Sequence, residues 1–84
     1  MTVPTVMIIN GLRVVIYPND HAPAHVHVMG NGAEARFSLR GADGQVELIE
    51  NYGFRSRMVA NIKAALTAEQ ESLIERWREI HRQE

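Results

Sequence analysis

The sequence contains no cysteine, and its nine basic residues include a single lysine, Lys63. The lack of cysteine excludes disulfide bonds, thiolate nucleophiles and thiolate metal ligands. No apolar run approaches the roughly 20 residues that a membrane-spanning helix needs, and the N-terminus lacks the pattern of a signal peptide. The net charge of −1 provides no basic field for nucleic-acid binding. We therefore expect a cytoplasmic protein without a membrane partner, whose net charge does not indicate a nucleic-acid partner.

The length of 84 residues suits one domain with one modest core. We expect a single domain over residues 1–84, in which residues 1–52 form mainly strands and residues 53–84 are helical. Chains of this size often gain stability from a bound metal or from a partner subunit. The other eight basic residues are arginines, which bind carboxylate or phosphate groups through paired hydrogen bonds.

Two Asn-Gly pairs predict β-hairpins in the first half of the chain. Asn10-Gly11 separates two apolar segments, and Asn31-Gly32 separates residues 24–30 from residues 33–40. An Asn-Gly pair between alternating segments favours a two-residue hairpin turn. The chain therefore begins as a series of antiparallel strands.

The register of the second hairpin decides which side chains share a face, because a slip by one residue exchanges the two faces. A two-residue turn pairs Val26 with Phe37 and Val28 with Ala35, which forms a consistent apolar face. This apolar face selects the register. The polar face then carries His25, His27, Arg36, Ser38 and Glu47.

The remaining segments complete the predicted fold. Residues 45–50 predict a further strand, with Val46 and Leu48 on the same face as Phe37. Residues 67–70 match a capping box that would open a second helix. We expect an α+β fold: an antiparallel sheet of about five strands, followed by two C-terminal helices packed on one face. The first helix is indicated by apolar residues at helical spacing, which are Phe54, Met58, Ile62 and Leu66.

The segment from Asn19 to Val28 contains three of the four histidines. His25 and His27 are two residues apart on a predicted strand, so both side chains lie on the same face. Asp20 and His21 precede the strand in a predicted loop that can fold over its end. Neutral imidazoles and carboxylates are ligands of zinc and of other divalent transition metals. One hypothesis is therefore a metal site formed by Asp20, His21, His25 and His27.

A second hypothesis gives the histidines a catalytic role. Two imidazoles on one face can divide the roles of general acid and general base near neutral pH. Arg36 on the neighbouring strand can hold a phosphate group. The set His25, His27 and Arg36 thus predicts a histidine-dependent nuclease, phosphodiesterase or nucleotide hydrolase.

Two further interpretations stay open. In the first, the histidine-rich polar surface docks a partner protein or a nucleic acid. In the second, the histidines have only a structural role: they satisfy loop carbonyl groups, and Asp20 caps a turn. The residues alone do not decide among these four hypotheses.

Several motifs together resemble a bacterial protein family. They are Asn19-Asp20-His21-x-Pro23-x-His25-Val26-His27-Val28, Glu34-Ala35-x-Phe37, Val46-Glu47-Leu48 and Gly53-Phe54, followed by a C-terminal helix with Trp77. Over nearly its whole length the chain is similar to the family called domain of unknown function 4160. The resemblance implies a small intracellular protein that binds a cognate protein encoded nearby, as in toxin–antitoxin modules, and it assigns no reaction. A homo-oligomer is the alternative to such a complex.

Overall fold

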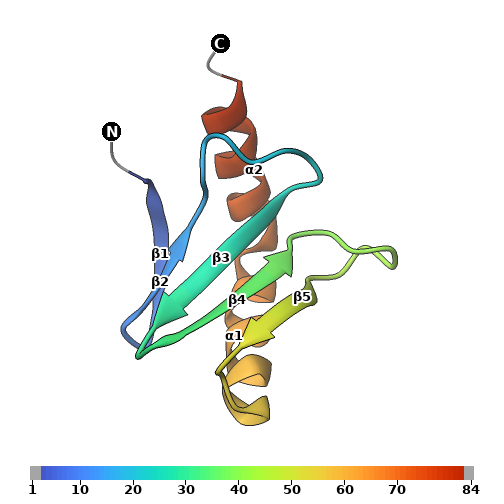
Figure 1. The fold of residues 1–84 in the computed structure, drawn as a ribbon. Helices are drawn as coiled ribbons and strands as arrows, with labels where there is room; N and C mark the ends of the chain where they lie inside the picture. Colours follow the sequence, from blue (N-terminus) through green and yellow to red (C-terminus); the bar gives the residue numbers. More distant parts are fainter. Residues whose placement is uncertain (1–2, 83–84) are drawn as a thin grey trace.

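A computed structural model of the protein describes residues 3–82. The elements are β1 Thr5–Ile9, β2 Leu12–Val15, β3 His25–Gly30, β4 Ala33–Ser38, β5 Glu47–Tyr52, α1 Ser56–Ala68 and α2 Gln70–His81. The five strands form one antiparallel sheet in the order β1-β2-β3-β4-β5. Both helices follow the strands and lie behind the sheet in Figure 1. The predicted α+β fold, with a five-stranded sheet and two C-terminal helices, is confirmed.

The two Asn-Gly pairs form the predicted hairpin turns. Asn10, Gly11, Asn31 and Gly32 have φ angles of 48°, 83°, 54° and 77°. A type I′ turn needs a positive φ at both central residues, which Asn and Gly adopt more readily than other residues. The second turn sets the predicted register between β3 and β4, with the pairs His25–Ser38, Val26–Phe37, His27–Arg36 and Val28–Ala35.

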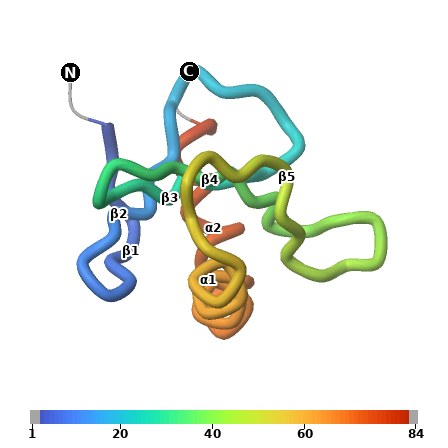
Figure 2. Tube along the Cα trace, turned by 60° about the horizontal axis from the view of Figure 1, so that its bottom comes forward, coloured from blue at the N-terminus to red at the C-terminus, as the bar shows by residue number. Residues whose placement is uncertain are grey.

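The core lies between the sheet and the helices. Val26, Val28 and Phe37 are fully buried on the inner face of β3 and β4. They belong to one apolar cluster with helix residues that include Ile62, Leu66, Leu73, Ile74 and Trp77. Figure 2 shows the helices on one side of the sheet and the loop of residues 16–24, here called the β2–β3 loop, on the other. The outer face of the sheet is therefore covered by a loop and the inner face by helices.

Glu69 alone separates α1 from α2. Thr67 lies within α1, and its hydroxyl donates a hydrogen bond to the Lys63 carbonyl, as a threonine inside a helix commonly does. The predicted capping box is therefore wrong: Glu69 is the N-cap of α2 and makes no side-chain capping bond. The Gln70 side chain instead donates to the Leu39 carbonyl and ties α2 to the end of the sheet. Within residues 3–82, neither helix is long and apolar enough to cross a bilayer.

β5 differs from the predicted strand in position and exposure. The prediction placed a strand over residues 45–50, with Val46 and Leu48 on the same face as Phe37. Val46 is buried, but β5 begins one residue later, and all of its residues are exposed, Leu48 to 38%. The helices lie beneath the middle of the sheet in Figure 2 and leave this edge uncovered. Leu48 pairs with Phe37 and so shares its face, as predicted, but it remains exposed because β5 is an edge strand that the helices do not cover.

Candidate metal centre

The β2–β3 loop brings a carboxylate back over the start of β3. Within the loop, the Asp20 amide donates to the Tyr17 carbonyl and closes a turn. Side chains alternate along β3, so Val26 enters the core while His25 and His27 lie on the outer face. The fold therefore places Asp20 of the loop against two histidines of the strand.

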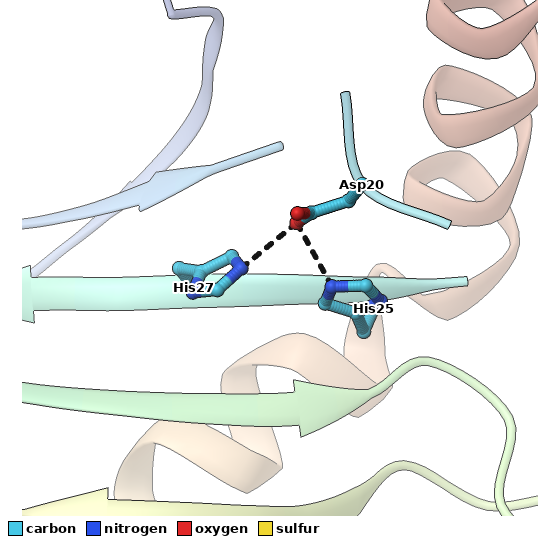
Figure 3. Close-up of side chains that lie close together, drawn as sticks. All are labelled: Asp20, His25 and His27. Carbon is cyan, nitrogen blue, oxygen red and sulfur yellow. Dashed lines mark hydrogen bonds and ion pairs between the residues drawn. The ribbon is translucent and has the colours of Figure 1, made fainter. Parts of the chain in front are cut away.

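Asp20, His25 and His27 converge on one point. Asp20 Oδ2 lies 2.9 Å from His25 Nε2 and 3.0 Å from His27 Nε2 (Figure 3). One ligand atom from each residue lies within 4.8 Å of the other two, and all three residues are partly buried. Within residues 3–82, no other group of three metal-ligating side chains converges in this way. We call this group the Asp20–His25–His27 cluster.

The other ring nitrogen of His25 decides what the cluster can bind. His25 Nδ1 donates to the Pro23 carbonyl at 2.9 Å, because a carbonyl oxygen can only accept. A neutral imidazole with its proton on Nδ1 carries a lone pair on Nε2, and this atom faces the Asp20 carboxylate. Two lone pairs repel each other at that distance, so a proton or a metal cation has to lie between them. A carbonyl on the outer ring nitrogen is also the usual contact that orients a metal-bound histidine.

His27 is oriented by two neighbours. Its Nδ1 lies 3.5 Å from Glu34 Oε2, within ion-pair distance. The Tyr17 ring packs edge-on against the imidazole, with ring centroids 4.7 Å apart. The two ring nitrogens thus each have a carboxylate neighbour, Glu34 at Nδ1 and the nearer Asp20 at Nε2. Both histidines therefore direct Nε2 to the same Asp20 oxygen and have an acceptor near Nδ1.

Trp77 connects the cluster to the helices. Its ring centroid lies 5.1 Å from that of His25, where α2 passes behind the β2–β3 loop (Figure 1). His81, one helical turn later, stacks on Trp77 with centroids 3.6 Å apart. Within this group of aromatic and imidazole rings, the side chains of His25 and His27 are only 11% and 15% exposed. The ligand atoms thus lie in a partly desolvated site whose floor belongs to the core.

The pKa of Asp20 reflects two opposing influences. Partial burial raises it, because desolvation disfavours the carboxylate. Hydrogen bonds from His27 and His25 and the charges of the two rings outweigh burial, so the pKa of Asp20 is lowered below its ordinary value of 3.8. The carboxyl group is therefore ionised at neutral pH, as a metal ligand has to be.

A family model described as Domain of unknown function (DUF4160) matches residues 11–78. The chain belongs to this family. The DUF4160 match includes the β2–β3 loop, the Asp20–His25–His27 cluster and Trp77. It confirms the resemblance carried by the histidine motif, and its description names no activity. Neither the curated proteins nor the solved structures gave a match.

In this DUF4160 chain, the four predicted metal ligands do not all meet. Asp20, His25 and His27 form the cluster, whereas His21 is exposed in the loop and lies outside it. His21 follows Asp20 directly, but the two side chains are placed differently by the loop. Three of the four predicted metal ligands therefore lie close together.

Arg36, predicted to hold a phosphate, lies on β4 opposite His27. It does not join the cluster, and its Nη2 lies 3.4 Å from Glu50 Oε1. It lines a pocket that His21 and His25 also line. The predicted catalytic residues His25, His27 and Arg36 thus share the outer face, and His25 belongs to both cluster and pocket.

The sequence did not reveal that Tyr17 and Trp77 contact the histidines. Trp77 follows the apolar pattern of its helix, and it is indeed a core residue. No local pattern relates a residue of α2 to the start of β3, because this contact depends on how the helix crosses the sheet. Tyr17 carries a weak signal, since it immediately precedes the turn that returns Asp20 to the strand.

Proposed function

We propose that this chain binds one divalent transition-metal ion through Asp20, His25 and His27, and that zinc is the best-fitting metal. The observation that carries the proposal is the convergence of Asp20 Oδ2 and two imidazole Nε2 atoms. Zinc accepts His nitrogen and Asp oxygen ligands at about 2.0–2.2 Å, which sets neighbouring ligand atoms of a tetrahedral site about 3.3 Å apart. The two separations between Asp20 and the histidine nitrogens, 2.9 and 3.0 Å, lie within roughly 0.3–0.4 Å of this value.

Three protein ligands leave one position of a tetrahedral zinc ion open. An open position is typical of catalytic zinc sites, whereas structural sites use four protein ligands. Zinc in an open site lowers the pKa of bound water to about 7 and so supplies hydroxide at neutral pH. We therefore infer a metal-dependent hydrolase of the nuclease, phosphodiesterase or nucleotide-hydrolase type. In this mechanism His25 and His27 hold the metal, and neither is the general acid or base.

Calorimetric titration of zinc into untagged, metal-free protein tests the metal site. We expect one zinc per wild-type chain and a loss of affinity of more than about 100-fold in His27→Ala. His21→Ala is the matched control, because it removes a histidine of the same segment that lies outside the cluster. This control should bind zinc like the wild type. Less than about 0.1 zinc per chain, or an equal loss in both variants, contradicts the proposal.

An activity assay separates a catalytic zinc site from a structural one. Zinc-loaded wild-type protein and Arg40→Gln, a variant of an arginine that pairs with Glu71 outside the cluster, should hydrolyse RNA or the model diester bis(p-nitrophenyl) phosphate. Asp20→Asn and His27→Ala should be inactive, because the first replaces a charged ligand with a neutral amide and the second removes a ligand. Stoichiometric zinc without hydrolysis of RNA, DNA or nucleotides would leave the metal site intact and refute the hydrolase.

The edge strand β5 favours a second candidate function, a partner-binding module of toxin–antitoxin type. Within residues 3–82, β5 pairs only with β4, and its outer edge is open (Figure 1). Ile49 and Tyr52 are 45% and 65% exposed beside Leu48. Such an edge is a template for a strand of another protein. Glu47 and Glu50 favour a partner strand that carries Lys or Arg.

We propose that the protein encoded by the neighbouring gene occupies this edge. After co-expression, the two proteins should elute together at micromolar concentration, and Tyr52→Lys should weaken the complex at least about tenfold. Ile8→Lys is the control, because Ile8 is also an exposed apolar residue and lies on β1 at the opposite edge of the sheet. Separate elution of the wild-type proteins contradicts the proposal. A dimer of this chain alone would assign the edge to a second copy instead.

A further inference from the structure

A pocket lies beside the Asp20–His25–His27 cluster, toward β4 and β5. It has a volume of about 230 Å³ and is lined by residues 21–23 of the β2–β3 loop and by His25, Arg36, Ser38 and Ile49. We call it the Arg36 pocket. Because His25 also belongs to the cluster, a ligand in this pocket would lie next to the proposed metal.

A β-bulge forms the outer wall of the Arg36 pocket. Arg36 pairs with Glu50 and Phe37 pairs with Leu48, so Ile49 is one residue in excess on β5. Bulges redirect side chains and are common next to functional sites. Here the bulged residue Ile49 closes one side of the pocket, and Glu50 comes within ion-pair distance of Arg36.

The guanidinium of Arg36 is incompletely satisfied. Its Nε is buried and has no hydrogen-bond partner among residues 3–82. Its Nη2 lies 3.4 Å from Glu50 Oε1, whereas the exposed pair Arg40–Glu71 is separated by 2.9 Å. A buried donor without an acceptor is unfavourable, and a guanidinium remains charged at any physiological pH. The guanidinium therefore has hydrogen-bonding capacity left for an oxygen atom of a bound ligand.

Three polar side chains that line the Arg36 pocket can donate hydrogen bonds to a ligand: the Arg36 guanidinium, the Ser38 hydroxyl and the His21 imidazole. His25 also lines the pocket, but its two ring nitrogens are engaged by the Pro23 carbonyl and by Asp20. No acidic residue is among the described residues that line it, and Glu50 approaches Arg36 from the edge strand. A set of donors around one fixed positive charge favours an anion with several acceptor oxygens.

The volume of the pocket limits the size of that anion. Pockets that enclose drug-sized molecules measure about 300–1,000 Å³, which is more than this pocket offers. Its volume suits one compact oxyanion group and leaves the remainder of a larger ligand outside. Phosphate fits this description, because its oxygens match the planar fork of an arginine.

We propose that the Arg36 pocket binds the phosphate group of a phosphate ester and presents it to the metal site through the shared residue His25. Phosphate binding follows from the pocket itself, whereas its presentation to a metal rests on the proposed function. Arg36 is thereby a substrate-binding residue, and Ile49 shapes the wall that excludes water from one side of the phosphate.

Inorganic phosphate is the probe, and metal-free full-length protein is the sample. In ¹⁵N–¹H NMR spectra, the Arg36 Nε–H resonance should shift and saturate with phosphate at constant ionic strength, with chloride as the reference salt. Arg36→Gln should lower phosphate affinity at least about tenfold. Arg36→Lys, which keeps the charge but lacks Nε, should fold normally and also lose affinity. Arg40→Gln is the matched control, because Arg40 pairs with a glutamate outside the pocket.

An unsaturable or absent shift at Arg36, or an equal loss in the Arg36 and Arg40 variants, overturns the proposal. His27→Ala distinguishes it from the proposed function, because His27 is a cluster residue that does not line the pocket. This variant should bind phosphate like the wild type and bind zinc weakly. A wild-type protein that binds phosphate but no zinc refutes the metal site alone. Zinc binding without phosphate binding refutes the Arg36 pocket alone.

Discussion

On β3, Val26 and Val28 are fully buried beneath the helices, whereas His25 and His27 lie on the outer face against the β2–β3 loop. The inner face is closed by apolar contacts with two helices. The outer face is closed by one loop, and its side chains interact through hydrogen bonds and ion pairs. The alternation of a single strand thus separates the residues that stabilise the fold from those that could carry its chemistry.

The two faces depend on different parts of the chain. The positions of His25 and His27 are set by the sheet, because the pairing of β3 with β2 and β4 fixes the backbone on both sides. The position of Asp20 is set by the loop and by its contacts with the two histidines. Substitutions on the inner face should therefore change the free energy of unfolding, and those on the outer face should change ligand binding.

The largest expected effect concerns the inner face. Phe37→Ala should lower the free energy of unfolding by about 3–5 kcal/mol, because it leaves a cavity in the core. Urea denaturation of the metal-free protein measures this loss. Phe37→Leu is the milder variant for zinc titration, and it should keep wild-type zinc affinity. If Phe37→Leu weakened zinc binding as strongly as His27→Ala, the two faces would be coupled.

Zinc should stabilise the protein through the outer face. At free zinc of 100 times the dissociation constant, the free energy of unfolding should rise by about 2.7 kcal/mol in the wild type. Asp20→Asn should show almost none of this increase, because the amide replaces a charged ligand. Denaturation with and without zinc provides the comparison. Equal stabilisation of both proteins would place zinc elsewhere.

Trp77 belongs to the core and also contacts His25, so its substitution tests whether the two faces are independent. Trp77→Phe keeps an aromatic core residue but weakens the ring contacts with His25 and His81. It should lower the free energy of unfolding by about 0.5–1.5 kcal/mol and zinc affinity by less than about tenfold. Tyr52→Phe, on the exposed edge, is the control and should change neither quantity. A Trp77→Phe variant with unaltered stability would argue against a stabilising role for the ring contacts of Trp77 with His25 and His81.

The smallest expected effect is a pH dependence of stability from Asp20. Its pKa is lowered in the folded state, so the carboxylate contributes stability that is present above the ordinary pKa of 3.8. This contribution disappears as the pH falls through the lower folded-state value. In metal-free protein, the stability difference between wild type and Asp20→Asn should therefore shrink as the pH falls from about 5 to below 3.8. A difference that stays constant over this range would contradict the proposed interactions of Asp20.

Much of the sheet could be predicted because local rules determine it. The Asn31-Gly32 turn and the alternation of apolar residues specify the β3–β4 register, and with it the shared face of His27 and Arg36. The exposure of Leu48 could not be predicted, since it depends on how far the helices extend across the sheet. The predicted capping box does not form, because Thr67 lies inside α1 and its hydroxyl donates to the Lys63 carbonyl one turn earlier.

The site was also predictable only in part, because some of its contacts depend on segments that are distant in the sequence. His25 and His27 share a face by strand periodicity alone. The spacing of Asp20 and His21 did not show which of them turns toward the strand, because the path of the β2–β3 loop decides this. The bulge at Ile49 and the contact of His25 with Trp77 join distant segments, and no local pattern encodes either of them.

X-ray absorption spectroscopy of the zinc-loaded protein tests the central claim most directly. We predict two imidazole ligands and oxygen ligands at about 2.0–2.2 Å from a four-coordinate zinc ion. The spectrum should be unchanged in His21→Ala and should lose one imidazole in His27→Ala. Three imidazoles that fall to two in His21→Ala would contradict the three-residue cluster. A spectrum without imidazole ligands would contradict the metal centre itself.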